Sequence, residues 1–138
     1  MQEQNDWNRQ VIEEFRANGG KVGGYFADIT LFLLTTTGAK SGQQRTIPLA
    51  YVPDGERLIT FASKGGAPTN PDWYYNLLAH PEVTVEVGNE TFQARATVAT
   101  GEEYQRLDTL ARKLSPAHAE LQAKTTRQIP LIVLERAS

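Results

Sequence analysis

The sequence contains no cysteine, which excludes disulfide bonds, thiolate nucleophiles and thiolate metal sites. Its two histidines, His80 and His118, have no carboxylate at a spacing typical of a metal site, so we expect no metal. A Gly-x-Ser-x-Gly motif, a P-loop and the dinucleotide-binding glycine pattern are also missing. If the chain is an enzyme, we expect a bound organic cofactor to supply the reactive chemistry.

Long apolar runs and an excess of positive charge are missing as well. The longest apolar stretches, 31–34 and 131–134, are too short to cross a bilayer, and residues 1–6 do not resemble a signal peptide. A net charge of −2 argues against binding to nucleic acid, so any anion site must be local. We expect one globular domain, residues 1–138, in the cytoplasm.

Hydrophobic periodicity predicts an alternation of short strands and helices. The strands are expected over 31–37, 46–52, 57–62, 83–87, 91–98 and 129–134, and the helices over 6–18, 71–80, 100–114 and 115–123. Hairpin connections dominate and no strand–helix–strand series is visible. The pattern therefore predicts an α+β fold in which an antiparallel barrel, or a strongly curved sheet, carries helices on its outside.

Several residues predict how these elements begin and end. Pro48 should restrict its strand to an edge or bulge position, because proline donates no backbone hydrogen bond. Asn70 is expected to cap the helix that begins at Pro71. Thr100 and Glu103 have the spacing of a capping box. The segments 53–55 and 88–89 are expected to form turns. Residues 18–20 are expected to end the first helix, and 23–24 to form an irregular connector.

The first helix has an apolar face that allows two interpretations. The face consists of Trp7, Val11, Ile12 and Phe15. It could touch a membrane peripherally, but Arg9 and Arg16 are offset by Glu13 and Glu14, so a basic face is missing. We prefer packing against the barrel.

The segment 37–45 joins two strands and has the composition of an anion-binding loop. Its glycines allow backbone N–H groups to converge, Lys40 and Arg45 add positive charge, and Ser41 adds a hydroxyl. An ordinary hairpin turn with solvated basic residues explains the same pattern.

The segment 62–66 repeats this composition at the end of another strand. Ser63, Lys64 and two glycines precede the helix over 71–80, although a flexible loop feeding a helix would look the same. On that helix we expect Trp73 and Leu77 to face the core, and Asn76 to lie at a site wall or to be exposed.

At these residues the chain resembles the deazaflavin (F420)-dependent nitroreductase family, over roughly residues 28–136. The resemblance rests on several blocks in order: LLTTTGAKSG at 33–42, Arg45 with Pro48 and Leu49, SKGG at 63–66, NPDWYYNL at 70–77, HPEV at 80–83 and TTRQIP at 125–130. It implies an antiparallel split β-barrel of the FMN-binding type with flanking helices.

The resemblance also implies the cofactor F420, a 5-deazaflavin with a phosphate and a polyglutamate tail. Its anionic part would be held by Ala39, Lys40, Ser41 and Arg45. The channel, the phosphate and ring region, and the flanking helix would involve Pro48, Leu49, Phe61, Ala62, Ser63, Lys64, Trp73 and Asn76.

The implied reaction is hydride transfer from C5 of the reduced deazaflavin to an activated C=C bond, a quinone or a nitro compound. Ser63 is the expected catalytic donor, and His118 is either a proton donor, a substrate contact or an exposed helix residue. Ser115, His118 and Leu121 stand where nitroimidazole-reducing members carry a tyrosine-rich segment. This departure weakens the case for nitroimidazoles and leaves conjugated enones, lactones and quinones open.

Two other interpretations stay open at this point. An FMN-dependent oxidoreductase on a related barrel would share the fold, and a non-catalytic protein that stores or delivers F420 would share the binding site. The chain could act as a monomer or a homodimer, because the helices could cover the sheet edges through which such barrels pair.

Overall fold

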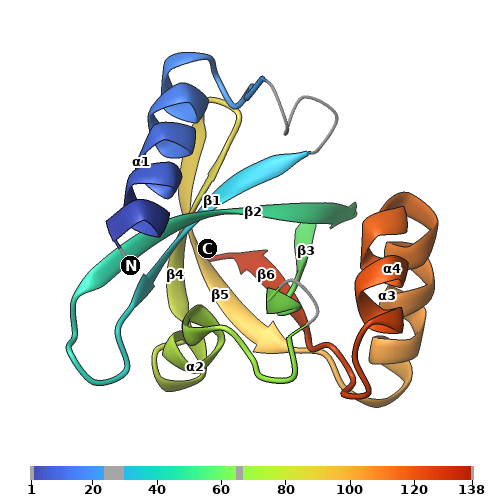
Figure 1. The fold of residues 1–138 in the computed structure, drawn as a ribbon. Coiled ribbons are helices and arrows are strands. Elements are labelled where there is room, and N and C mark those ends of the chain that lie inside the picture. Colours follow the sequence, from blue (N-terminus) through green and yellow to red (C-terminus); the bar gives the residue numbers. More distant parts are fainter. Residues whose placement is uncertain (1, 24–29, 65–66, 138) are drawn as a thin grey trace.

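The strands form one closed barrel, and the helices surround it (Figure 1). The computed structural model describes residues 2–23, 30–64 and 67–137, the first six of these by their backbone alone. The elements along the chain are α1 (Gln2–Ala17), β1 (Leu31–Thr37), β2 (Gln44–Asp54), β3 (Arg57–Phe61), α2 (Asp72–Ala79), β4 (Glu82–Val87), β5 (Glu90–Val98), α3 (Gly101–Leu114), α4 (Pro116–Ala123) and β6 (Leu131–Arg136).

All neighbouring strands are antiparallel, in the order β1-β2-β3-β6-β5-β4, and β4 returns to β1. This confirms the α+β split barrel. The last strand begins later than expected, because the backbone groups of Ile129 bond to side chains instead of a strand. Its N–H donates to Gln122 Oε1 at 3.0 Å, and its carbonyl accepts the Tyr104 hydroxyl at 2.7 Å.

The apolar run at the start of β1 is continuous because both faces of this strand are covered. Phe32 and Leu34 point into the barrel, where they join its core. Leu31 and Leu33 point outward and pack against Val11 and Phe15 of α1. The expected packing of the first helix on the barrel is thus confirmed; the side chain of Trp7 lies outside the described part.

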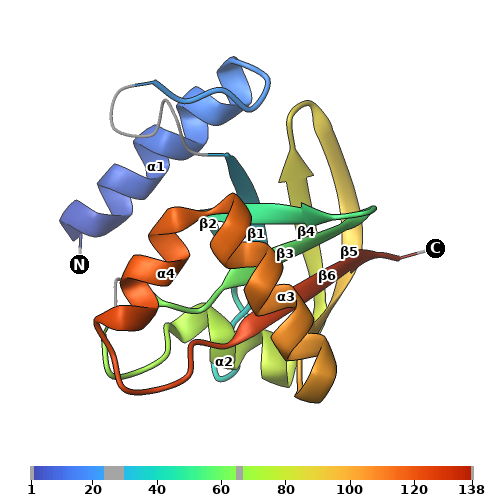
Figure 2. The same ribbon diagram turned by 90° about the vertical axis from the view of Figure 1, so that its right-hand side faces the viewer.

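The helices cover different parts of the barrel (Figure 2). Leu107 and Ala111 of α3 pack on the outer faces of β3 and β6. Trp73 and Leu77 of α2 are 8% and 2% exposed and join the barrel core, as the sequence predicts. Within the described residues no helix is long and apolar enough to span a membrane.

The first half of β2 lacks a second paired strand in the otherwise closed barrel. β2 pairs with β1 from Gln44 to Ala50, but with β3 only from Tyr51 to Asp54. The half of β2 that contains Pro48 therefore has a neighbour on one side only, which confirms the edge position expected for this proline.

Three predicted local features are wrong. The tight turn between β2 and β3 lies at 55–56, with Gly55 at φ +61°, because the strand pairing continues through Pro53 and Asp54. Pro71 itself occupies the capping position of α2, and the Asn70 amide is bonded elsewhere. Thr100 stands at the start of α3, but its side chain forms no capping hydrogen bond.

Candidate functional site

The two loops with the composition of anion sites lie at one end of the barrel, on either side of α2 (Figure 1). The first loop, residues 38–43, joins β1 to β2, and the second segment, residues 62–70, joins β3 to α2. Gly65 and Gly66, which the sequence analysis assigned to the second loop, and Gly24 of the irregular connector lie outside the described residues. The first loop and the second segment, which the β2–β3 hairpin separates in sequence, thus lie at the same end of the barrel.

The first loop closes on its own backbone. The Gly38 N–H donates to the Gln43 carbonyl at 2.8 Å, the Gly42 N–H donates to the Gly38 carbonyl at 3.0 Å, and the Gln43 N–H donates to Ser41 Oγ at 3.2 Å. A Cβ atom on Gly38 would lie 2.5 Å from Ser41 Oγ, so only glycine lets this hydroxyl turn inward. The loop is therefore a preformed turn.

Asn76 of α2 holds the first loop in place. Its Oδ1 accepts the Ala39 N–H at 3.0 Å, and its Nδ2 donates to Thr36 Oγ1 at 3.4 Å. Asn76 therefore holds the loop from the side of α2, and the Ala39 N–H is bonded to Asn76 and not free for a ligand. The side chains of Lys40 and Arg45 are exposed and have no ion pair among the described residues, so their charges can act on an anion.

The second segment has an unusual backbone conformation at its cation. Lys64 lies in the left-handed region at φ 48°, the only non-glycine residue described with a positive φ. Its carbonyl accepts the Ala67 N–H at 3.1 Å, and its Nζ lies 3.4 Å from Thr69 Oγ1. Such conformations persist where the surroundings enforce them, often at functional sites.

Arg127 contacts this segment on both sides of Lys64, although the sequence predicts no role for it. Its guanidinium reaches five acceptors of the second segment: the carbonyls of Ala62, Ser63, Ala67 and Thr69 and the Asn70 side chain. The signal available in the sequence was the arginine in the TTRQIP block, 57 residues beyond its partner Asn70. Its partners could not be inferred without the fold.

The remaining residues expected to bind the cofactor lie at different depths. Ala62 is fully buried and Trp73 nearly so, and both contribute to the barrel core. Leu49 is half-buried and packs against that core, whereas its neighbour Pro48 falls on the opposite face of the strand. Phe61 and Ser63 are half-buried at the end of β3.

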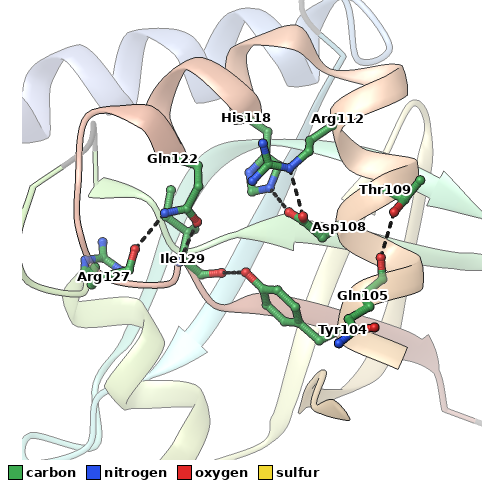
Figure 3. Close-up of polar contacts among 9 residues, drawn as sticks. All are labelled: Tyr104, Gln105, Asp108, Thr109, Arg112, His118, Gln122, Arg127 and Ile129. Carbon is green, nitrogen blue, oxygen red and sulfur yellow. Dashed lines mark hydrogen bonds and ion pairs between the residues drawn. The ribbon is translucent and has the colours of Figure 1, made fainter. Parts of the chain in front are cut away.

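His118 is buried, with 1% of its surface exposed, so the exposed-helix interpretation is wrong. Its Nε2 lies 2.9 Å from Asp108 Oδ1 (Figure 3). Its ring stacks on Phe61, with the ring centroids 4.7 Å apart. Burial raises the pKa of Asp108, but hydrogen bonds from His118 and Arg112 outweigh it, so the net pKa is lowered. Nδ1 of His118 is buried and has no hydrogen-bond partner among the described residues.

A hollow of about 780 Å³ lies elsewhere, beside the end of α1 and the start of β1. Leu31, Tyr51 and Gly88 are among the residues that line it. The first loop follows the other end of β1, so this hollow is separated from the predicted anion site by the length of the strand.

Comparison with known proteins identifies the family of the chain. A model of the F420H(2)-dependent quinone reductase family matches residues 7–136. The chain belongs to this family. As a family member it is an F420-dependent oxidoreductase, which confirms the resemblance seen in the sequence and the cofactor that the resemblance implied.

Individual relatives agree with this assignment. The chain is 36% identical to an F420H(2)-dependent quinone reductase of Mycobacterium tuberculosis over 126 residues, which cover 88% of this chain and 85% of the relative. A solved F420-H2 dependent reductase is 42% identical, with a TM-score of 0.70, over 76% of this chain and 93% of its own. Another solved structure, described as a domain-swapped dimer, is 38% identical with a TM-score of 0.73, over 96% and 99% of the two chains.

The donor set at the two loops fits an anionic cofactor. Lys40, Arg45 and Lys64 supply three exposed positive charges, and Ser41 and Ser63 supply hydroxyl groups. The N–H groups of Gly38, Ala39, Gly42 and Gln43 are bonded within the protein, so the groups that the first loop offers to an anion are its side chains. Family membership sets aside the FMN-dependent enzyme and the non-catalytic carrier.

Proposed function

We propose that the chain reduces quinones with F420H2, at the end of the barrel where the two loops flank α2. The observation that carries the proposal is that the two loops on either side of α2 carry three exposed cations, Lys40, Arg45 and Lys64 (Figure 1). F420H2, when bound, supplies a hydride to the substrate. Together with one proton, that hydride converts a quinone to a hydroquinone.

The residues of the chain act in this proposal by binding and orienting. Lys40, Ser41 and Arg45 hold the anionic tail, and Lys64 holds the phosphate. The open side of β2, where Leu49 faces the barrel interior, leads from these charges toward Ser63. The Ser63 hydroxyl has no partner among the described residues, so it is available to donate a hydrogen bond to the substrate oxygen on which negative charge develops.

His118 has an indirect role in the same proposal. Its burial and its bond to Asp108 keep it from open contact with a substrate, whereas its ring supports Phe61 at the end of the strand that leads to Ser63. We therefore assign it the positioning of Phe61. The proton for the hydroquinone then comes from solvent.

The substrate class is tested by following the oxidation of F420H2 by absorbance with three acceptors. A short-chain naphthoquinone, cyclohexenone and a nitroimidazole are compared at equal concentrations, each with a control that lacks the protein. We expect the quinone to give the highest kcat/KM. A higher value with the enone or the nitro compound would contradict the proposed substrate while leaving the F420 assignment in place.

Ser63 is tested by removing and then restoring its hydroxyl. Ser63→Ala should lower kcat about 100-fold, the usual effect of losing one preorganised donor, while the Kd for F420 stays unchanged. Ser63→Thr keeps the hydroxyl and should recover much of the rate. Full activity in Ser63→Ala would remove Ser63 from the mechanism.

The relative described as a domain-swapped dimer bears on assembly, because it matches 96% of this chain. We infer that this chain also forms a homodimer. Light scattering coupled to size-exclusion chromatography should give twice the mass of 15.3 kDa. The monomer mass at all concentrations tested would refute the inference.

A further inference from the structure

Arg127 lies before β6, far in sequence from the second loop, and yet contacts that loop along its length. Nε donates to the Ala67 carbonyl at 3.0 Å, and Nη1 donates to Asn70 Oδ1 at 2.7 Å. Nη2 donates to the carbonyls of Ala62, Ser63 and Thr69, at 3.0, 3.0 and 3.1 Å. The guanidinium group has five N–H donors, and here all three nitrogens point at the same segment.

The acceptors lie on both sides of Lys64. Ala62 and Ser63 precede it, whereas Ala67, Thr69 and Asn70 follow it. One planar, rigid group therefore holds together the two arms of the turn in which Lys64 adopts its left-handed conformation. A loop that is held in this way keeps Ser63 and Lys64 in fixed positions before any ligand arrives.

Arg127 is itself held by the two helices outside the barrel (Figure 3). Its carbonyl accepts a hydrogen bond from Gln122 Nε2 of α4 at 2.7 Å, and Gln122 Oε1 accepts the Ile129 N–H at 3.0 Å. The Tyr104 hydroxyl of α3 donates to the Ile129 carbonyl at 2.7 Å. Helices α3 and α4 thus hold the backbone at Arg127 and Ile129, on both sides of Gln128. The guanidinium group of Arg127 in turn holds the loop.

All five acceptors are uncharged, and Arg127 forms no ion pair with any carboxylate in the part of the chain that the structure describes. Its positive charge is therefore not neutralised by a neighbouring side chain. It adds to the charge of Lys64 on the same loop, so the group that shapes the loop also favours an anion on it.

We propose that Arg127 is the positioning residue of the cofactor loop: it presets Ser63 and Lys64 for the anionic cofactor without touching it. This inference rests on the proposed function, in which the second loop holds the phosphate of F420. Without Arg127 the loop would have to be ordered during binding, and the cost of ordering would appear as weaker affinity.

The first experiment compares Arg127→Ala with Arg136→Ala, a matched control that removes the same charge. Arg136 pairs with Glu90 and lies over the ring of Phe92, at the end of β6. Arg127→Ala should raise the Kd for F420 by about tenfold or more, measured by fluorescence titration, and the control should not. In the cofactor-free protein, hydrogen exchange should accelerate in peptides covering 62–64 and 67–70 and stay unchanged elsewhere.

The second experiment separates geometry from charge. Arg127→Lys keeps the positive charge but cannot reach five acceptors with one ammonium group, so it should bind F420 nearly as weakly as Arg127→Ala. Wild-type affinity in Arg127→Lys would overturn the proposal, because charge alone would then explain the effect. Wild-type affinity or unchanged loop exchange in Arg127→Ala would overturn it as well.

If Arg127→Ala does not fold, Asn70→Ala tests the contact from the loop side. It removes the acceptor of Nη1 and should raise both the Kd and the local exchange rate, by a smaller factor. Unchanged values would refute the positioning role. The Kd for F420 and the hydrogen-exchange rate of the loop do not depend on the substrate. A protein that binds F420 but reduces no quinone would contradict the proposed reaction. The role of Arg127 would still be decided by the Kd and the exchange rate.

Discussion

Asn76 shows how one side chain determines the shape of a binding loop. The sequence predicts it at a site wall or exposed, and in the structure its side chain bonds to the Ala39 N–H and to Thr36. Its Oδ1 must accept and its Nδ2 must donate, so the amide fits this position in one orientation. In the proposed function, Asn76 thus serves the anion site by positioning a loop and not by contacting the anion.

Substitution of Asn76 should separate loop positioning from charge. Asn76→Ala loses both hydrogen bonds and should raise the Kd for F420 roughly three- to tenfold. Asn76→Asp keeps the acceptor but adds a negative charge beside Lys40, so it should bind F420 more weakly still at low salt and approach Asn76→Ala at high salt. Fluorescence titration at two ionic strengths measures this.

The matched control for Asn76 is Gln93→Ala, which removes an exposed amide bonded to Thr84 on the barrel surface. It should leave the Kd unchanged. Equal affinity of Asn76→Asp and the wild-type protein at low salt would show that Asn76 lies too far from the bound anion for its charge to matter.

At the scale of elements, the apolar pattern predicts strands well and helix caps poorly. The strand over 31–37 was expected with its observed bounds, because four consecutive apolar residues fill two packed faces at once. The Asn70 cap failed because Pro71 takes the capping position and the Asn70 side chain accepts a hydrogen bond from Arg127, a residue close in space but distant in sequence. Local spacing cannot reveal a competing contact that exists only after the barrel has closed.

The hairpin of β2 and β3 is joined to α3 through a carboxylate. Asp54 Oδ1 and Oδ2 accept hydrogen bonds from Arg106 at 3.1 and 3.0 Å, and Oδ2 also accepts from Arg57. The hydrogen bonds from Arg106 and then from Arg57 lower the pKa of Asp54 to about 2. Because the folded state favours the ionised form, this contact stabilises the fold above the unfolded pKa of about 3.9 and loses its effect as the pH falls toward 2.

Asp54→Asn should therefore destabilise the protein in a pH-dependent way. At pH 7 its Tm should be lower than that of the wild-type protein by about 2–4 °C, a modest effect because the contact lies near the surface. The difference should shrink between about pH 4 and pH 2. Glu56→Gln, which changes an exposed carboxylate of the same hairpin, is the control; a difference that persists at pH 2 would show that ionisation of Asp54 is not the cause.

At the scale of the whole molecule, barrel closure brings the site together. The hairpins and the two loops could be predicted from composition, but the pairing of β3 with β6 and of β1 with β4 joins segments that no local pattern links. That closure places Arg127 against the 62–70 segment and buries His118 against Asp108. The residues proposed to bind the cofactor could thus be named from the sequence, whereas the contacts of Arg127 that hold the second loop could not.

The molecule as a whole repels anions weakly, with a net charge of −2, so the proposed site would bind an anionic cofactor through the local cations at one end of the barrel. Lys40→Ala and Lys64→Ala should each raise the Kd for F420 by roughly three- to tenfold at low salt. Lys113→Ala, which removes an exposed charge at the end of α3, should have little effect although the net charge changes equally. Fluorescence titration over a range of salt concentrations distinguishes the local charge of the loops from the net charge of the molecule. If all three variants lose affinity alike, net charge governs binding. The assignment of the phosphate to Lys64 and of the tail to Lys40 would then be wrong.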